Sequence, residues 1–263
     1  MHTTPKRTFL TTKQWLSLAG AAVVAASLAP TAVLAQAPQA KGSATDKAMV
    51  FPNPAKDPTK PAAGGVKWFW ATHARNFERR KAGNIGLCFL GDSITQGWPA
   101  DLFGKYYGGL NGVNFGCGGD KIQNLLMRLE GDDGELMGTA PKVIVLLIGI
   151  NNMGDNTPEE IAYGIDHMIK YLGKQCPKSK VLLLAILPTK GGDNDKIKSV
   201  NKLTAKFDNA KNVRFMDMGP KFLGPDGNAE ASLFSDNVHL SRKGYEVWHD
   251  TMNPLLTQMM AAP

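Results

Sequence analysis

Residues 143–148 read Val-Ile-Val-Leu-Leu-Ile, a run that is apolar at every position. A strand with one face in water alternates apolar and polar residues, so an unbroken apolar run indicates a strand that is covered on both faces. Further short apolar runs lie at residues 85–90, 112–115, 181–187 and 213–216. Strands of this kind belong to parallel sheets, whose successive strands require crossover connections. The run therefore predicts an α/β fold with a parallel sheet between helical layers.

The segments between these runs carry helix signals. Residues 157–160, Thr-Pro-Glu-Glu, supply a capping Thr, a Pro at the first helical position and a Glu three residues after the cap. An apolar face at helical spacing follows, formed by Ile161, Ile165, Met168, Ile169 and Leu172. Further helices are expected over residues 121–129 and 195–207, and a last one from about Ser241 that Pro254 interrupts. This alternation predicts a right-handed, doubly wound sheet.

The first part of the chain has the pattern of a targeting segment. Basic side chains at positions 6, 7 and 13 precede an apolar stretch over residues 15–34, and small residues then offer cleavage sites. This order is typical of a secretory signal peptide, here assigned to residues 1–37. An N-terminal membrane anchor is the alternative, which Pro30 disfavours by interrupting the apolar stretch. Lys6-Arg7 resembles a twin-arginine signal with its first arginine replaced, so the general and the twin-arginine export routes both stay open.

Removal of that segment leaves a Pro- and Ala-rich lead-in over residues 38–66 and one α/β domain over residues 67–263. The expected location is the periplasm or the external medium. The net charge of +7 comes without a dense Lys/Arg run among aromatic residues, so no nucleic-acid partner is expected. No second apolar stretch is long enough to span a membrane after processing. The 3 cysteines form no C-x-x-C or Cys/His cluster, so neither a metal site nor a disulfide framework is predicted.

Polar motifs follow the first three expected strands. They read Gly-Asp-Ser-Ile-Thr-Gln-Gly over residues 91–97, Asn-Phe-Gly-Cys-Gly-Gly-Asp over 114–120 and Gly-Ile-Asn-Asn over 149–152. Ligands of doubly wound sheets bind outside the carboxyl ends of the strands, which is where these motifs lie. Each motif also has a plain reading, as a capping serine, a glycine turn or an asparagine turn. Neither glycine-rich nucleotide fingerprint is present, so no nucleotide cofactor is expected.

A fourth motif near the end of the chain offers a base. Residues 235–241 read Ser-Asp-Asn-Val-His-Leu-Ser, which places Asp236 three residues before His239. Such a carboxylate can hold the imidazole in one tautomer, so that the other ring nitrogen takes a serine proton. The plain reading is a solvated polar loop. The other histidines are His2, in the signal segment, and His73, His167 and His249, in helix-like segments that favour surface or core roles.

Together the four motifs, in this order, resemble the SGNH (GDSL) hydrolase superfamily from Trp68 to Leu256. Asn-Phe-Gly-x-Gly-Gly-Asp, Gly-x-Asn-Asn and Asp-x-x-His-Leu-Ser-x-x-Gly-Tyr are similar to the platelet-activating-factor acetylhydrolase Ib catalytic-subunit branch and its exported bacterial relatives. The resemblance implies a flavodoxin-like three-layer α/β/α sandwich with a five-stranded parallel sheet. It also implies hydrolysis of small acyl esters, without a cofactor or metal, by a hydrolase domain over residues 67–263.

The resemblance assigns roles to single residues. It implies that Ser93 is the nucleophile, that His239 is the base and that Asp236 orients the base. The implied oxyanion donors are the N–H groups of Ser93 and Gly119 and the side chain of Asn151, with the adjacent Gly118 N–H as an alternative. Cys117 stands where the family pattern has an aliphatic residue, which predicts sensitivity to thiol reagents.

The expected substrate is a small-molecule or glycan ester. The core fold fills most of the domain and leaves little chain for a lid or acyl-binding cap, which favours a short acyl group, above all acetate. Export favours a substrate met outside the cytoplasm, such as an acetylated polysaccharide. The alternatives are a lysophospholipase or phospholipid acetylhydrolase, a transferase that moves an acyl group to a sugar, and a carbohydrate-binding module without catalysis. The sequence leaves the oligomeric state open.

Overall fold

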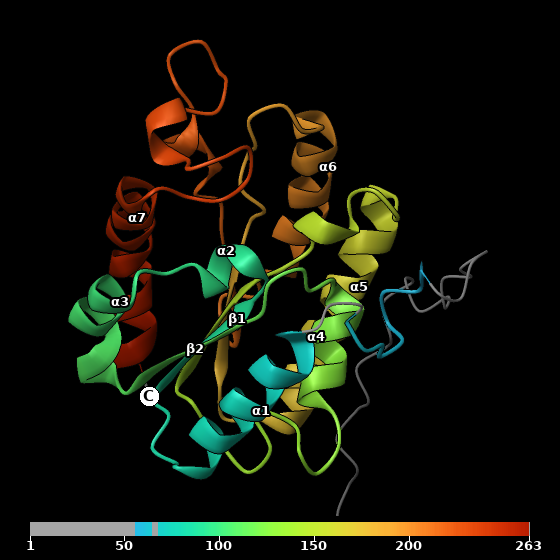
Figure 1. Ribbon diagram of the computed structural model, residues 1–263, viewed down its shortest axis with the longest axis vertical. Helices are drawn as coiled ribbons and strands as arrows, with labels where there is room; N and C mark the ends of the chain where they lie inside the picture. Colours follow the sequence, from blue (N-terminus) through green and yellow to red (C-terminus); the bar gives the residue numbers. More distant parts are fainter. Residues whose placement is uncertain (1–55, 65–67, 263) are drawn as a thin grey trace, which may run out of the picture. The chain divides into compact units, whose positions relative to one another are not determined.

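The computed structural model describes residues 56–64 and 68–262. The expected signal peptide, residues 1–37, and most of the expected lead-in lie outside these residues. One parallel sheet of five strands has the order β2-β1-β3-β4-β5 (Figure 1). The strands are β1 Leu87–Gly91, β2 Gly112–Gly116, β3 Val143–Leu147, β4 Lys180–Leu184 and β5 Val213–Met216. This order confirms the predicted flavodoxin-like sheet.

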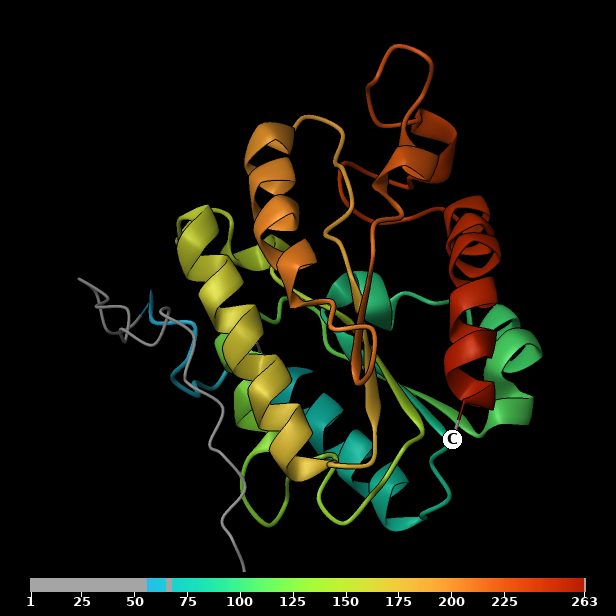
Figure 2. The ribbon, with the colours of Figure 1, turned by 180° about the vertical axis from the view of Figure 1, so that it is seen from behind.

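Helices cover both faces of the sheet, as the unbroken apolar strands require (Figures 1 and 2). The α-helices are α1 Trp68–Lys81, α2 Ser93–Gln96, α3 Ala100–Tyr107, α4 Ile122–Leu129, α5 Pro158–Gln175, α6 Asn194–Thr204 and α7 Arg242–Ala261. Short 3₁₀ helices are η2 Gly108–Leu110, η3 Ile150–Asn152, η4 Ala205–Phe207, η5 Gly219–Phe222 and η6 Ala231–Leu233. The expected capping box at the start of α5 is present, with Thr157 and Glu160 each bonded to the backbone of the other.

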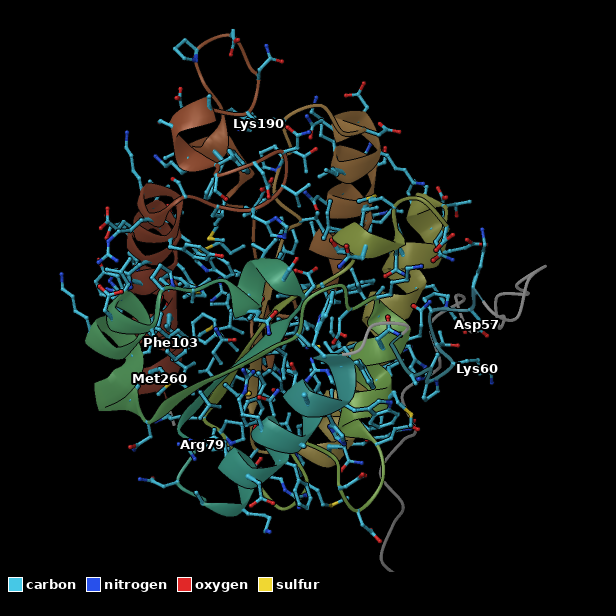
Figure 3. The ribbon with its side chains drawn as sticks, viewed as in Figure 1. Asp57, Lys60, Arg79, Phe103, Lys190 and Met260 are labelled. Atoms are coloured by element: carbon cyan, nitrogen blue, oxygen red, sulfur yellow. The ribbon has the colours of Figure 1, made fainter. Side chains whose placement is uncertain are left out.

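Alternate residues of each strand enter two separate cores. In β3, Ile144 and Leu146 face α4, α5 and α6, whereas Val143, Val145 and Leu147 face α3 and α7. The second core is rich in aromatic rings, among them Phe89, Tyr107 and Trp248. Phe103 on α3 and Met260 on α7 lie at its edge (Figure 3). Among the described residues no helix is long and apolar enough to cross a membrane.

Strand β4 is shorter than its apolar run predicts. It ends at Leu184, although residues 185–187 are also buried. The side chain of Asn201 on α6 accepts from the Ile186 N–H at 2.9 Å and donates to the Ile186 carbonyl at 2.8 Å. An amide side chain thus replaces the neighbouring strand as the partner of this backbone.

Helix α7 does not break at Pro254, so the predicted interruption is wrong. The helix runs from Arg242 to Ala261 with Pro254 inside it. Pro254 is exposed, so the carbonyl that its ring leaves without a donor can bond to water. Met252, Leu256 and Met259 are buried on either side of it, and their packing holds the helix together across the proline.

Candidate active site

Ser93 begins α2 directly after β1, so its hydroxyl lies at the carboxyl edge of the sheet. Gly91 makes this tight junction possible, because a β-carbon there would lie 2.2 Å from Thr95 Oγ1 and 2.3 Å from the Leu147 carbonyl oxygen. The Asp92 carboxylate caps the helix by accepting from the Ile94 N–H at 2.9 Å. The N–H of Ser93, in the first turn, has no acceptor within the helix.

Asp92 is a buried carboxylate with 1% of its surface exposed. Burial raises the pKa of Asp92 to about 7, although the Ile94 N–H opposes the shift, and the charge of Asp120 adds to it. The native pKa lies above that of an unfolded Asp, so between about pH 4 and pH 7 the native protein binds more protons than the unfolded chain. Stability at this site therefore falls as the pH rises through that window.

Asp92→Asn should stabilise the protein more at pH 8 than at pH 5. The amide oxygen still accepts from the Ile94 N–H, but no charge is buried. Between the two pH values, the gain in the free energy of unfolding relative to the parent should grow by about 1–3 kcal/mol. Urea denaturation at both pH values measures this difference. An equal effect at pH 5 and pH 8 would show that Asp92 does not titrate in this range.

Asp236 and His239 lie together in a loop that closes on itself. The Ser235 N–H donates to the His239 carbonyl at 2.9 Å, and Phe234 pairs with Leu240 in an antiparallel bridge. Asp236 Oδ1 accepts from the N–H groups of Val238, at 2.8 Å, and His239, at 2.7 Å. These backbone donors, with the imidazole, hold the pKa of Asp236 well below its usual range. The carboxylate is therefore ionised and can only accept hydrogen bonds.

A continuous hydrogen-bonded series links this loop to the end of β1. His239 Nδ1 lies 2.7 Å from Asp236 Oδ2, and His239 Nε2 lies 2.8 Å from Ser93 Oγ. Because the carboxylate only accepts, Nδ1 carries the proton, and in the neutral ring Nε2 accepts from the serine hydroxyl. The structure thus brings together the three side chains that the sequence proposes as a triad, in the geometry that serine activation requires.

The two glycines of the loop after β2 differ in whether their N–H groups already have an acceptor. The Gly118 N–H donates to Gln96 Oε1 at 2.9 Å, and so already has an acceptor. Gly119 is exposed and has a φ of +79°, a conformation that favours glycine. No acceptor in the described part of the chain takes the Gly119 N–H. Of the two glycine donors, the geometry favours Gly119.

The two asparagines of the Gly-x-Asn-Asn motif differ in their hydrogen-bond partners. Asn151 Nδ2 donates to the Asp120 carbonyl at 2.9 Å, which leaves its second amide hydrogen for another acceptor. Asn152 is fully buried, and its Oδ1 accepts from the Ile122 N–H at 3.0 Å, at the start of α4. Asn151 thus borders the same loop as Gly119, while Asn152 anchors the helix beneath it.

A buried ionic network supports this loop from below. Arg128 on α4 has no exposed surface and donates to Asp120 Oδ2 at 2.9 Å and to the Phe115 carbonyl at 3.0 Å. Arg128 also pairs with Glu135, which in turn contacts His73 Nδ1 at 3.1 Å. Burial works to lower the pKa of Arg128, but the charges of Glu135 and Asp120 outweigh it and raise the pKa. The hydrogen bond to Glu135 raises the pKa of His73. This histidine thus has the core role that its helix predicts.

Cys117 does not have the exposure that its predicted reactivity requires. The residue is fully buried, and burial raises the pKa of its thiol to about 11. Because the thiolate is the reactive form, these two properties disfavour reaction with thiol reagents. The expectation of thiol sensitivity is therefore not supported.

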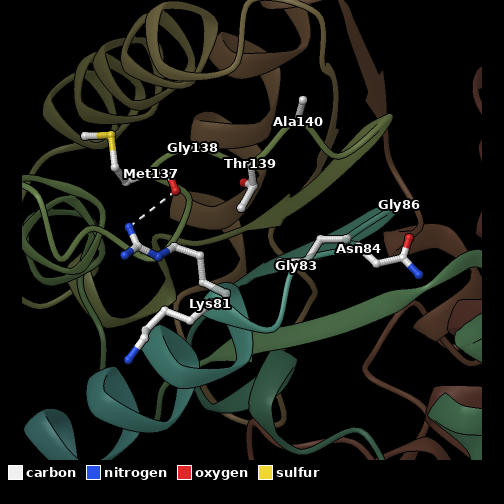
Figure 4. A pocket seen from close by; sticks show the side chains of 10 residues that line it. Lys81, Gly83, Asn84, Gly86, Met137, Gly138, Thr139 and Ala140 are labelled. Atoms are coloured by element: carbon white, nitrogen blue, oxygen red, sulfur yellow. Dashed lines mark hydrogen bonds between the residues drawn. The ribbon is translucent and has the colours of Figure 1, made fainter. Parts of the chain in front are cut away.

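The opposite end of the sheet has a hollow of about 500 Å³ (Figure 4). It lies just before β1, lined by residues such as Asn84 and Gly86, and so away from Ser93. Arg80, one of the two cations that line it, donates to the carbonyls of Asp132, Gly134 and Met137. Among the described residues no group of three or more His, Cys, Asp or Glu side chains is placed to hold a metal ion.

The sequence matches the GDSL-like lipase/acylhydrolase family over residues 89–247. The chain belongs to this family. It is 32% identical over 216 residues to the platelet-activating factor acetylhydrolase IB subunit alpha1 of Homo sapiens, and the match spans 80% of this chain and 92% of the relative. The alpha2 subunit of Rattus norvegicus is 30% identical over 215 residues, with 79% and 92% of the two chains covered.

Solved structures share the fold of this GDSL acylhydrolase. A GDSL-like lipase from Bacteroides thetaiotaomicron has a TM-score of 0.59 at 20% identity, and the match covers 72% of this chain and 98% of that one. A carbohydrate esterase family 3 protein from Talaromyces cellulolyticus has a TM-score of 0.50 at 19% identity, covering 67% and 98%. With its family and its acetylhydrolase relatives, the chain is a carboxylic ester hydrolase.

Proposed function

We propose that this enzyme is an exported serine esterase that removes acetyl groups from a carbohydrate. One observation carries the proposal: Ser93 Oγ lies 2.8 Å from His239 Nε2, and Nδ1 of the same ring lies 2.7 Å from the ionised Asp236. Three donors lie in the segments that follow the first three strands at this edge of the sheet, namely the N–H groups of Ser93 and Gly119 and the second amide hydrogen of Asn151. They suit the negative oxygen that forms when a serine attacks an ester.

In the proposed reaction, His239 Nε2 takes the hydroxyl proton as Ser93 Oγ bonds to the ester carbonyl carbon. The carbonyl oxygen becomes an oxyanion, which the three donors stabilise. The bond to the alcohol oxygen then breaks, and the alcohol leaves with the proton from His239. A water molecule then gives a proton to the same nitrogen as its oxygen bonds to the acyl carbon. The bond from that carbon to Ser93 Oγ breaks as His239 returns the proton to the serine, and the acid that leaves ionises to acetate. Asp236 stays ionised throughout and stabilises the imidazolium.

Two observations support a short acyl group. The described chain beyond the sheet and its covering helices consists of connecting loops and short 3₁₀ helices, which leaves little to enclose a long acyl chain. The relatives with 30–32% identity are named acetylhydrolases. Carbohydrate as the alcohol portion is supported by the expected export, and the fold is one that a carbohydrate esterase also uses.

Export is supported by residues 1–37, where basic residues precede an apolar stretch and small residues follow it. Sequencing the N-terminus of the protein recovered from the periplasm or the medium tests it. A chain that still begins at Met1 would contradict it.

A phospholipid acetylhydrolase is the second candidate. It is favoured by the 32% identity to the platelet-activating factor acetylhydrolase subunit, which aligns over 92% of that relative. Both candidates cleave an acetyl ester and need the same three side chains. They differ in the alcohol portion, so a direct comparison of an acetylated pyranoside with a 2-acetyl glycerophospholipid separates them.

The acyl preference should appear in hydrolysis of p-nitrophenyl esters from acetate to decanoate. We expect kcat/KM to be highest for acetate and to fall as the chain lengthens, because residues 56–64 and 68–262 form no cap that would enclose a long chain. Labelling by an alkyl fluorophosphonate, read by mass spectrometry, should place the adduct on Ser93. A rise in kcat/KM toward decanoate would favour a lipid substrate. A folded protein that neither cleaves any ester nor reacts with the phosphonate would overturn the esterase proposal.

A further inference from the structure

We propose that the indole of Trp68 forms the wall of a subsite that binds the sugar ring carrying the acetyl ester. This inference rests on the proposed function. Trp68 begins α1, and 53% of its surface is exposed. Its Nε1–H donates to the Gly118 carbonyl at 3.1 Å. A single exposed apolar side chain is common on protein surfaces, but a ring that is fixed by a hydrogen bond to the loop beside Ser93 offers a flat surface for a ligand.

The position of Trp68 relative to the nucleophile follows from Gly118. A β-carbon built on Gly118 would lie 3.3 Å from Trp68 Nε1 and 3.9 Å from Ser93 Cβ. The indole and the serine therefore both lie next to Gly118, where Gln96 Oε1 is nearer still, at 2.9 Å from the same point. In the proposed subsite, a substrate whose carbonyl reaches Ser93 places its alcohol portion near the indole.

The indole is held in place before any ligand binds. Phe69, the next residue, is fully buried, and His73 and Asn76 on the inner face of α1 bond to the buried Glu135. The hydrogen bond to Gly118 fixes the ring itself. A side chain that is already ordered loses little rotational freedom on binding, so its contact contributes fully to affinity.

The chemistry of the surface favours a sugar over an alkyl chain. One face of a pyranose presents C–H groups that pack on an aromatic ring, while its hydroxyls stay in water around the rim. Such a ligand suits an indole that is open to solvent, whereas an alkyl chain gains most from an enclosed apolar pocket. An acetyl group has two carbons, one of which is bonded to Ser93 during the reaction. The group that covers Trp68 therefore belongs to the alcohol portion.

Selectivity between two acetate esters tests this assignment. Acetate release would be measured from methyl O-acetyl-β-xylopyranoside, which has a ring to stack, and from ethyl acetate, which has none. Trp68→Ala should lower the ratio of the two kcat/KM values by about tenfold, mainly through KM for the sugar ester. Trp68→Phe keeps a flat ring without the N–H donor and should retain most of the ratio. Trp70→Ala is the matched control.

Trp70 is a suitable control because it shares the helix and the exposure of Trp68. Its exposed fraction is 51%, but two residues along an α-helix turn its side chain by about 200° around the axis. Trp70→Ala should leave the ratio of the two kcat/KM values unchanged. A loss with Trp70→Ala as large as that with Trp68→Ala would mean that the whole helix, rather than this indole, sets the selectivity.

Two results would overturn the subsite. Equal losses on both acetate esters in Trp68→Ala would mean that the indole only supports the Gly118 loop. A selective loss on ethyl hexanoate would place the indole on the acyl side. Binding of the xylopyranoside ester to Ser93→Ala, measured by calorimetry, separates the subsite from the reaction. Binding that Trp68→Ala weakens about tenfold supports the subsite even if the parent hydrolyses nothing, whereas undetectable binding refutes it.

Discussion

Ser93→Ala should reduce kcat for p-nitrophenyl acetate by at least about 10⁴-fold, because alanine removes the oxygen that bonds to the carbonyl carbon. What remains would be attack by water, still assisted by the Gly119 N–H and the Asn151 amide. The imidazole of His239 would keep its bond to Asp236 and lose only its bond to Ser93 Oγ. Initial rates at saturating ester, with active-site titration of the parent, measure the change.

The fold should tolerate this substitution. Ser93 is half-buried, and its hydroxyl makes one side-chain hydrogen bond in the described structure, to His239. We expect a change in the free energy of unfolding within about 1 kcal/mol. Ser199→Ala serves as the matched control, since Ser199 is exposed on α6 and its hydroxyl donates to the Asp195 carbonyl at 2.9 Å. A Ser93→Ala protein that keeps a tenth of the parental kcat would rule out the serine as nucleophile.

Arg128→Met should destabilise the protein by about 3–5 kcal/mol, the cost of leaving buried charges without their partner. Asp120 and Glu135 expose 1% and 0% of their surface, and Arg128 is the cation that contacts both. Burial raises the pKa of Asp120 to about 6 even with Arg128 present, and its loss should raise it further. A folded-state pKa above that of the unfolded chain means that Asp120 costs more stability as the pH rises and it ionises. The variant should therefore be less destabilised at pH 5 than at pH 8.

Catalysis should suffer as well, because Asp120 follows Gly119 and its carbonyl orients Asn151. At a temperature where the variant is folded, kcat should fall about 10- to 100-fold. Removal of a whole oxyanion donor typically costs about 100- to 1000-fold, and here the donor is only less well oriented. Arg128→Lys keeps the charge but not the planar set of donors, and should recover part of both losses. Arg128→Met combined with Asp120→Asn and Glu135→Gln should recover stability. A loss below 1 kcal/mol in Arg128→Met alone would show that the network is not structural.

The sheet could be predicted because its strands are apolar at every position. The ends of the strands could not, since β4 stops at Leu184 while the side chain of Asn201 bonds to the backbone of Ile186, a contact that periodicity does not reveal. Pro254 misled for a related reason. The effect of Pro254 on α7 depends on which face of the helix its ring occupies. The apolar residues Met252, Leu256 and Met259 continue the helical spacing past the proline, whereas the prediction rests on the general tendency of proline to end a helix.

The motifs at the strand ends could be predicted to meet, because the carboxyl ends of parallel strands share one edge. The supporting residues could not all be found in this way. Arg128 could have been found, because it is a charged residue among the apolar positions of α4, such as Leu125 and Leu129, and a charge there indicates a buried partner. Glu135 lies in a polar loop, and Trp68 lies well before the first motif, so neither carries a pattern that separates it from surface or core residues.

The Asp236 loop also bears on how such an enzyme changes over evolution. Three hydrogen bonds join Asp236 to the loop backbone and to the His239 ring, so the proposed acid and base lie in one short segment of the chain. Ser93 lies 146 residues away, and in the described structure the hydrogen bond between Ser93 Oγ and His239 Nε2 joins it to that segment. The Tyr245 hydroxyl donates to the Ile94 carbonyl beside Ser93. We therefore expect that mutations in the surrounding loops can change which ester is accepted and leave the hydrogen bond between Asp236 and His239 unchanged. Drift in selectivity should leave its traces around Trp68 and the loop after β2 rather than in residues 234–240.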